Sequence, residues 1–243
     1  MPGRKAAEAD WTVFPGKGLG KLEFGMSGAQ VDALSDTYGV VTRRMNDLVP
    51  DDILRDTLEA FGDAMSEDEK RDFIAAYEDN APTADSVTET RGNPGLVLSY
   101  RADRLVEIMP AILQRPLFVD GKDIFALREL EPLALLERLN AHPGRYAGTE
   151  AAFDNLAISV DGFCVTDMAT GVRTLDETDE RFLQRTVVLR SSPYLPAQEV
   201  DRFILHSVTD SPRQSPPSST HQELSHPRRN RLVGGVLRGG SGG

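Results

Sequence analysis

The chain has 243 residues, of which 40% are hydrophobic and 27% are charged, enough apolar side chains for a full core in one domain or two small ones. It contains neither an apolar run of 18 residues nor an apolar stretch near its first residues, which argues against a membrane span and a signal peptide. We therefore expect a cytoplasmic protein with no membrane partner. Cys164 is the only cysteine, and the four histidines lack the spacing of metal ligands. This excludes an intramolecular disulfide, and we expect neither a metal nor a cofactor.

The formal net charge of −11 is unevenly distributed along the chain. Residues 211–243 carry five arginines and one glutamate, a charge of +4, which leaves −15 on residues 1–210. An acidic surface repels nucleic-acid phosphate and accelerates the association of basic protein surfaces. We therefore expect a basic protein partner and no nucleic acid.

The stretch from Gly16 to Gly39 combines turn, strand, cap and helix signals in quick succession. Two glycines flank Lys17, the short apolar run 22–24 predicts a strand, and Ser27 followed by Gln30 forms a capping box. The helix that begins there is expected to end near Gly39. This pattern specifies a local shape and no chemistry.

An acidic segment, residues 48–79, has only three basic residues among many Asp and Glu residues. Apolar residues from Leu54 to Met65 recur with the period of an amphipathic helix, and a second capping box, Ser66 with Glu69, predicts a second helix. The carboxylates should line the outer face of this helical pair, either as a solvated surface or as a docking surface for a basic partner. The segment lacks the loop pattern of a calcium site. The candidate binding residues are Asp63, Glu67, Asp68 and Asp72.

The pattern of the remaining chain predicts hairpins, one helix and further short elements. Residues 81–95 are rich in Pro, Thr, Asn and Gly and predict a loop. Three hairpins are expected, around Ala102-Asp103, Asp120-Gly121 and Asp161-Gly162, the first two in one antiparallel sheet. The other expected elements are a helix with Leu133, Leu135, Leu136 and Leu139 on its apolar side, a strand at 186–189, and a strand or helix within 200–208.

This order predicts an α+β fold in which helices pack on one face of an antiparallel sheet. It also suggests two duplicated units, each a helix followed by hairpins. The expected organisation is an N-terminal extension at 1–15, a first unit at 16–125 that includes the acidic insertion 48–79, a second unit at 126–210, and a disordered tail at 211–243.

The segment from Leu22 to Leu34, a short strand followed by Gly-Met-Ser and a helix with Val31, resembles the opening of small αβ binding modules. These are the BamE (SmpA/OmlA) and beta-lactamase-inhibitor-protein types. It is also similar to openings in immunity-like proteins of bacterial polymorphic toxin systems. In those proteins, sequence segments like 95–98 and 105–108 of this chain follow the opening. The resemblance covers about a third of the chain. It implies a protein partner, such as a toxin, and transfers no catalytic residue.

Few residues favour catalysis. Cys164 lies inside an apolar strand pattern, and His142 lies at a predicted helix end, positions typical of a structural cysteine and a capping histidine. The main hypothesis is a non-catalytic, immunity-like or inhibitor-like module that docks a basic partner through its acidic helices. The alternatives are a small hydrolase that uses Asp167, Asp176 and His142, and a structural scaffold protein.

Overall fold

The computed structural model describes residues 8–46, 65–71, 85–92, 95–110, 116–167, 169–193 and 202–209. All of them belong to the compact unit Met1–Ser211. The predicted α+β class is confirmed, because a large antiparallel sheet carries a few helices. The predicted disordered tail at 211–243 and most of the acidic insertion lie outside the described residues.

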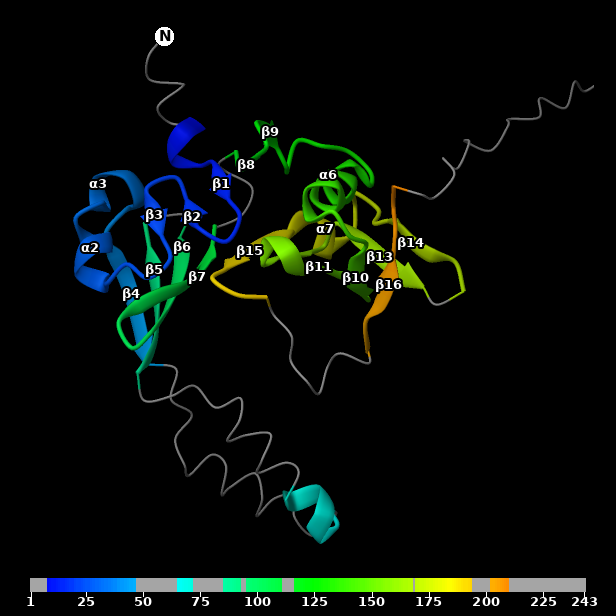
Figure 1. Cartoon of the computed structure of the whole chain (residues 1–243), viewed down its shortest axis with the longest axis horizontal. Coiled ribbons are helices and arrows are strands. Elements are labelled where there is room, and N and C mark those ends of the chain that lie inside the picture. Colours follow the sequence, from blue (N-terminus) through cyan, green and yellow to red (C-terminus); the bar gives the residue numbers. More distant parts are fainter. Residues whose placement is uncertain are drawn as a thin grey trace, which may run out of the picture. The chain divides into compact units, whose positions relative to one another are not determined.

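One antiparallel sheet of nine strands dominates the described fold (Figure 1). Its spatial order is β16-β10-β11-β12-β15-β7-β6-β5-β4. The strands are β4 (Val41–Asn46), β5 (Ser86–Arg91), β6 (Leu96–Arg101), β7 (Arg104–Met109), β10 (Gly144–Ala147), β11 (Glu150–Phe153), β12 (Ile158–Asp161), β15 (Thr186–Arg190) and β16 (Ile204–His206).

The sheet consists of two four-stranded meanders whose last strands meet in the middle. Strands β4 to β7 form the first meander, and β10, β11, β12 and β15 form the second. The two meet where Leu189 and Arg190 of β15 lie opposite Ile108 and Glu107 of β7. The first predicted unit supplies four strands of this continuous sheet and the second, with β16, supplies five, while the duplication itself stays a prediction.

The stretch that begins at Gly16 folds largely as expected. A small three-stranded sheet is formed by β1 (Val13–Phe14), β2 (Gly18–Leu19) and β3 (Leu22–Glu23). At Gly18, φ is +145° and a Cβ atom would lie 1.9 Å from the Leu22 carbonyl oxygen, so a side chain cannot be accommodated there.

The capping box of Ser27 and Gln30 is confirmed, with both reciprocal hydrogen bonds present at the start of helix α2 (Gly28–Asp32). A second short helix, α3 (Ser35–Tyr38), follows and ends at Gly39. The Gly25 amide and the Met26 carbonyl hydrogen-bond to the backbone of Leu105 in β7, which attaches this stretch to the first meander.

Helix α6 (Glu131–Asn140) covers the second meander, where it contacts β11. Leu133, Leu135 and Leu136 are buried as predicted, but Leu139 is 37% exposed. The buried positions at the end of the helix are instead the polar residues Glu137 and Asn140. The inward face therefore turns polar in the last helical turns, which the leucine pattern did not indicate.

Two predicted hairpins are confirmed locally. Strands β6 and β7 flank Ala102 and Asp103, which both have positive φ angles, as a tight type I′ connection requires. The hairpin around Asp120-Gly121 is β8 (Phe118–Val119) and β9 (Lys122–Asp123). This second hairpin is a separate two-stranded sheet, so the prediction that it shares a sheet with the first was wrong.

Two further predictions were wrong. Residues 86–91 are not a loop but strand β5, whose β-branched residues pair with both neighbouring strands. The third hairpin does not form, because β12 pairs with β11 and β15. The following strand, β13 (Cys164–Asp167), pairs instead with β14 (Gly171–Thr174). In the range 200–208, β16 confirms a strand.

The end of the described chain is attached to α6 by a buried carboxylate. Glu137 accepts hydrogen bonds from the Val208 amide at 2.8 Å, from the Thr209 hydroxyl at 2.8 Å and from the Ser207 hydroxyl. Glu137 is buried, and β16 adds to the sheet edge beside β10. One helix residue therefore anchors the last strand.

Candidate functional site

The acidic surface predicted from the sequence is described only at residues 65–71, so Asp63 and Asp72 lie outside the described residues. Residues 67–71 are helical, and the predicted capping box is confirmed. The Ser66 amide donates to Glu69 at 2.7 Å, and the Glu69 amide donates to the Ser66 hydroxyl at 3.2 Å. These bonds with Ser66 lower the pKa of the Glu69 carboxyl.

Glu67 and Asp68 are highly exposed, with side chains 87% and 81% accessible. Each already has a cationic neighbour one helical turn away. Lys70 lies 2.7 Å from Glu67, and Arg71 lies 2.7 Å from Asp68. Exposed pairs of this kind are weak, so a partner's basic side chains can compete for these carboxylates at little cost.

The two aspartates of the hydrolase alternative accept hydrogen bonds within their own turns. Asp167 accepts hydrogen bonds from the amides of residues 169 and 170, and Asp176 accepts from the Thr178 amide and hydroxyl. These bonds lower the pKa of both carboxyls. His142 is exposed beyond the end of α6, and no hydrogen bond between described residues joins its ring to either aspartate.

Cys164 is fully buried, and burial raises the pKa of its thiol to about 12. A thiol with such a pKa stays protonated at neutral pH and is a poor nucleophile. This agrees with the prediction that Cys164 is a structural residue of the core and not a nucleophile.

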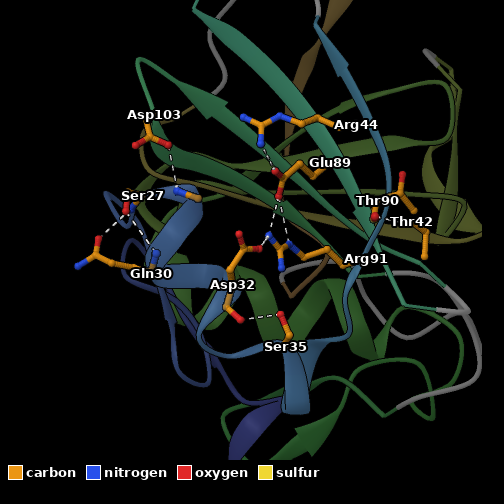
Figure 2. A network of polar contacts seen from close by, with 11 residues as sticks. Ser27, Gln30, Asp32, Ser35, Thr42, Arg44, Glu89, Thr90, Arg91 and Asp103 are labelled. Atoms are coloured by element: carbon orange, nitrogen blue, oxygen red, sulfur yellow. Dashed lines mark hydrogen bonds and ion pairs between the residues drawn. The ribbon is translucent and has the colours of Figure 1, made fainter.

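The inner face of the first meander holds a charged network that the sequence did not indicate (Figure 2). Glu89 and Arg91 occupy alternate positions of β5 and are both almost completely buried. Arg91 donates to Glu89 through Nε at 3.1 Å and through Nη2 at 2.8 Å, and its Nη2 also donates to Asp32 at 2.5 Å. Arg44 of β4 approaches the other Glu89 oxygen at 3.1 Å.

Figure 2 shows Glu89 between the two guanidinium groups, with Asp32 of α2 beside the guanidinium of Arg91. Burial opposes the charged form of Arg91, but hydrogen bonds to Asp32 and Glu89 outweigh this effect and raise its pKa. The network therefore joins α2 to strands β4 and β5 through charge-assisted hydrogen bonds.

A cleft of about 340 Å³ opens beside this network. We call it the Asp85–Asp103 cleft. Its floor includes Tyr100, whose pKa is raised by burial and by the nearby Glu89 charge. Asp103 is held in place by the Gly28 amide at 3.0 Å, at the beginning of α2 (Figure 2). The residues that line the cleft are Arg44, Asp85, Val87, Tyr100, Ala102 and Asp103.

A second groove, of about 320 Å³, crosses β11, β12 and β15. Its two arginines are matched by carboxylates, because Arg190 pairs with Glu107 at 2.8 Å and Arg202 pairs with Glu150 at 2.7 Å. Asp161 also lines this groove, where it accepts from the Thr149 hydroxyl at 2.6 Å and forms no ion pair with a described residue.

Across the described part of the chain, no group of three or more His, Cys, Asp or Glu side chains is arranged to hold a metal ion. No described helix is long and apolar enough to cross a membrane.

Comparisons of this chain with protein-family models, with curated proteins and with solved structures found no match. The resemblance of residues 22–34 to binding modules therefore remains a prediction.

Sequence reasoning missed Glu89 and Arg91 because the segment was interpreted as a loop from its Pro, Asn and Gly residues. A signal was present in the run Val87-Thr88-Glu89-Thr90-Arg91. β-branched residues favour a strand, and opposite charges two positions apart on a strand point to the same face. It could not be known from the sequence that this face is the buried one.

Proposed function

We propose that this protein is a non-catalytic binding module, of an immunity-like or inhibitor-like kind, that docks a basic protein partner through its acidic helical surface. The observation that supports the proposal is the exposure of Glu67 and Asp68 on a capped helical turn. Asp167 and Asp176, the aspartates suggested for hydrolysis, accept hydrogen bonds within local turns.

Charge supports a basic partner. Residues 1–210 carry −15, and long-range attraction of this size accelerates encounter with a positively charged surface. Attraction between exposed charges is screened over about 8 to 10 Å at physiological ionic strength. Association should therefore slow markedly as salt concentration rises.

The test is capture of a partner from the native host, followed by binding kinetics. A four-site variant neutralises the surface through Asp63→Asn, Glu67→Gln, Asp68→Asn and Asp72→Asn. We expect a lower association rate and a smaller salt dependence, with little change in the dissociation rate.

A matched control changes the net charge by the same amount at exposed carboxylates elsewhere. Its substitutions are Glu23→Gln, Asp36→Asn, Asp120→Asn and Glu177→Gln. If both variants slow association equally, only the overall charge matters and the acidic helical surface is not the docking site. If neither variant differs from the natural chain, the proposal is wrong.

A further inference from the structure

Three arginines are buried in the part of the chain that the structure describes, and one of them lacks a counter-ion. Arg91 and Arg145 each donate two or more hydrogen bonds to carboxylates, at 2.5 to 3.1 Å. Arg185 is only 7% exposed, yet its side chain forms neither an ion pair nor a hydrogen bond with a described residue. Its guanidinium is therefore the exception among these buried charges.

Aromatic rings surround the Arg185 guanidinium in place of carboxylates. Its central carbon lies 3.8 Å from the centre of the Phe182 ring, which belongs to helix α7 (Glu180–Leu183). The rings of Phe163, between β12 and β13, and Phe125, after β9, lie at 5.3 and 5.9 Å. Ring faces attract a positive charge but are poor hydrogen-bond acceptors, so the five N–H donors of the group remain unsatisfied.

The two terminal nitrogens of Arg185 reach the surface. Its Nε is inaccessible and has no hydrogen-bond partner, whereas Nη1 and Nη2, which also form no hydrogen bond with a described residue, retain contact with solvent. The guanidinium is thus held from behind by the rings and presents its forked end outward. A donor pair of this kind, fixed in place and without an acceptor, calls for an external partner.

The nearest carboxylates do not provide that partner. Asp123 accepts from the amides of Leu117 and Phe125, and Glu177 is exposed. Burial lowers the pKa of Arg185, and the negative charges of Glu177 and Asp123 oppose this effect only in part. This is the reverse of Arg91, whose pKa is raised because hydrogen bonds to carboxylates outweigh burial. Charged groups with a pKa perturbed in this way gather at functional sites.

We infer that Arg185 is a binding site for a carboxylate group of a ligand. The two oxygens of a carboxylate match the two terminal nitrogens of a guanidinium, and this bidentate pair supplies the acceptors that the rings lack. The rings also restrict the side chain, so little freedom is lost on binding. The nearby charges of Asp123 and Glu177 disfavour a doubly charged phosphate. The inference is independent of the proposed function, which concerns a basic surface.

The experiment titrates the full chain with sodium acetate and follows the backbone amides and the Nε–H signal of Arg185 by NMR. Sodium chloride at equal ionic strength, sodium phosphate and neutral acetamide are the comparison probes. We expect saturable shifts at Arg185 and at residues 163 and 182 with acetate, weaker shifts with phosphate, and none with acetamide. Absence of saturable shifts at Arg185 with acetate would overturn the inference, as would equal shifts with chloride or tighter binding of phosphate.

Two peptides separate the possible sources of the carboxylate. Acetyl-alanyl-leucine has a free C-terminal carboxylate, and its amide has none. Tighter binding of the free acid than of acetate supports the C-terminus of a polypeptide as the ligand, and equal binding supports a small free carboxylate. Binding of the amide at Arg185 as tightly as the free acid would overturn the inference.

Two variants and a control locate the contact. Arg185→Met removes the charge and the donors and should abolish the acetate-dependent shifts of the neighbouring amides. Arg185→Lys keeps the charge but loses the planar fork, and should raise the dissociation constant for acetate roughly fivefold. The control Arg181→Met removes an exposed arginine of α7 and should leave acetate binding nearly unchanged. Equal weakening by the variants at 181 and 185 would overturn the inference.

Thermal unfolding distinguishes a ligand-binding charge from a structural one. In chloride alone, Arg185→Met should melt no lower than the natural chain, because it removes a buried charge that has no counter-ion. Acetate should raise the melting temperature of the natural chain and not that of Arg185→Met. The Arg185→Lys chain gives the same comparison if Arg185→Met does not fold. If acetate stabilises the natural chain no more than chloride does, Arg185 is a structural cation and the inference is wrong.

Discussion

The two meanders of the sheet are covered differently, and their interiors differ accordingly. The second lies under α6, a helix of ten residues and about 15 Å, whose leucines make an apolar interior. The first lies beside α2 and α3, of five and four residues. There β5 buries Glu89 and Arg91, next to the apolar Leu98 and Leu96 of β6.

The length of the covering helix affects which side chains a sheet face can bury. A short helix supplies few apolar side chains, so part of the sheet face is filled by charged groups that satisfy one another. Such groups must be matched in both charge and geometry. The first meander therefore offers polar chemistry beside its core, whereas the polar anchor of the second, Glu137, is fully occupied by the last strand.

The largest effect is expected from removing one member of the buried ion pair. Arg91→Met leaves Glu89 buried with only Arg44 as its charged partner and should lower the free energy of unfolding by about 3 kcal/mol or more. Chemical denaturation measures this loss. Adding Glu89→Leu to the same chain should restore part of it, because no unmatched charge then remains buried.

The control is Arg101→Met, an exposed arginine on β6, which should change stability by no more than about 0.5 kcal/mol. Equal effects at positions 91 and 101 would show that the network contributes nothing to the first meander.

Removing the charge of Glu137, the polar anchor of the second meander, should lower the free energy of unfolding by less and affect a smaller part of the fold. Glu137→Gln removes the charge that accepts from residues 207–209 and should lower the unfolding free energy by about 1.5 to 3 kcal/mol. Hydrogen exchange should accelerate at 204–208 before it does in β11 or β12. The neighbouring exposed Arg138→Ala serves as control, and unchanged exchange in β16 would refute the anchor role.

Loss of the cap of helix α2, beside the first meander, should have a smaller effect. Ser27→Ala removes the hydroxyl that accepts from the Gln30 amide and should destabilise by about 1 kcal/mol in chemical denaturation. Ser35→Ala, in the next helix, is a suitable comparison because the Ser35 hydroxyl donates to a carbonyl and caps no amide. A loss below a few tenths of a kcal/mol at position 27 would mean that the cap does not contribute.

Alkaline pH tests the apolar interior around Cys164. Its thiol pKa rises from 9.0 to about 12 on folding, so between these values the unfolded chain loses the proton that the folded chain keeps. The unfolded state then binds fewer protons, and the unfolding free energy falls as pH rises above about 9. Cys164→Ala should flatten this slope, measured by denaturation at pH 8 to 10.5. An unchanged slope would show that the buried tyrosines, not Cys164, cause the loss.

The smallest effect is expected beyond both meanders. Deleting residues 211–243 should leave the melting temperature unchanged within error, because this stretch has few apolar side chains with which to offset its ordering entropy. Differential scanning calorimetry of the two chains makes the comparison. A drop of several degrees would show that the segment contributes to the folded body.

The sequence by itself determined the local features. The capping boxes of Ser27 and Ser66 and the tight turns at Ala102-Asp103 and Asp120-Gly121 depend on side chains and backbone angles within a few residues, so their patterns can be read directly. The α+β class followed because helical and strand patterns alternate along the chain.

Only the tertiary structure decided which strands pair and which charges are buried. The turn at Asp161-Gly162 predicted a hairpin, yet β12 lies between β11 and β15, because strand pairing maximises burial over the whole sheet rather than between neighbours. Glu89 and Arg91 belong to the interior because Arg44 and Asp32, 45 and 59 residues away, complete their charge. The cleft at Asp85 and Asp103 likewise forms where the turn between two strands meets the beginning of a helix. Such long-range matches of charge leave no periodic pattern in a single sequence, and therefore only the folded chain reveals them.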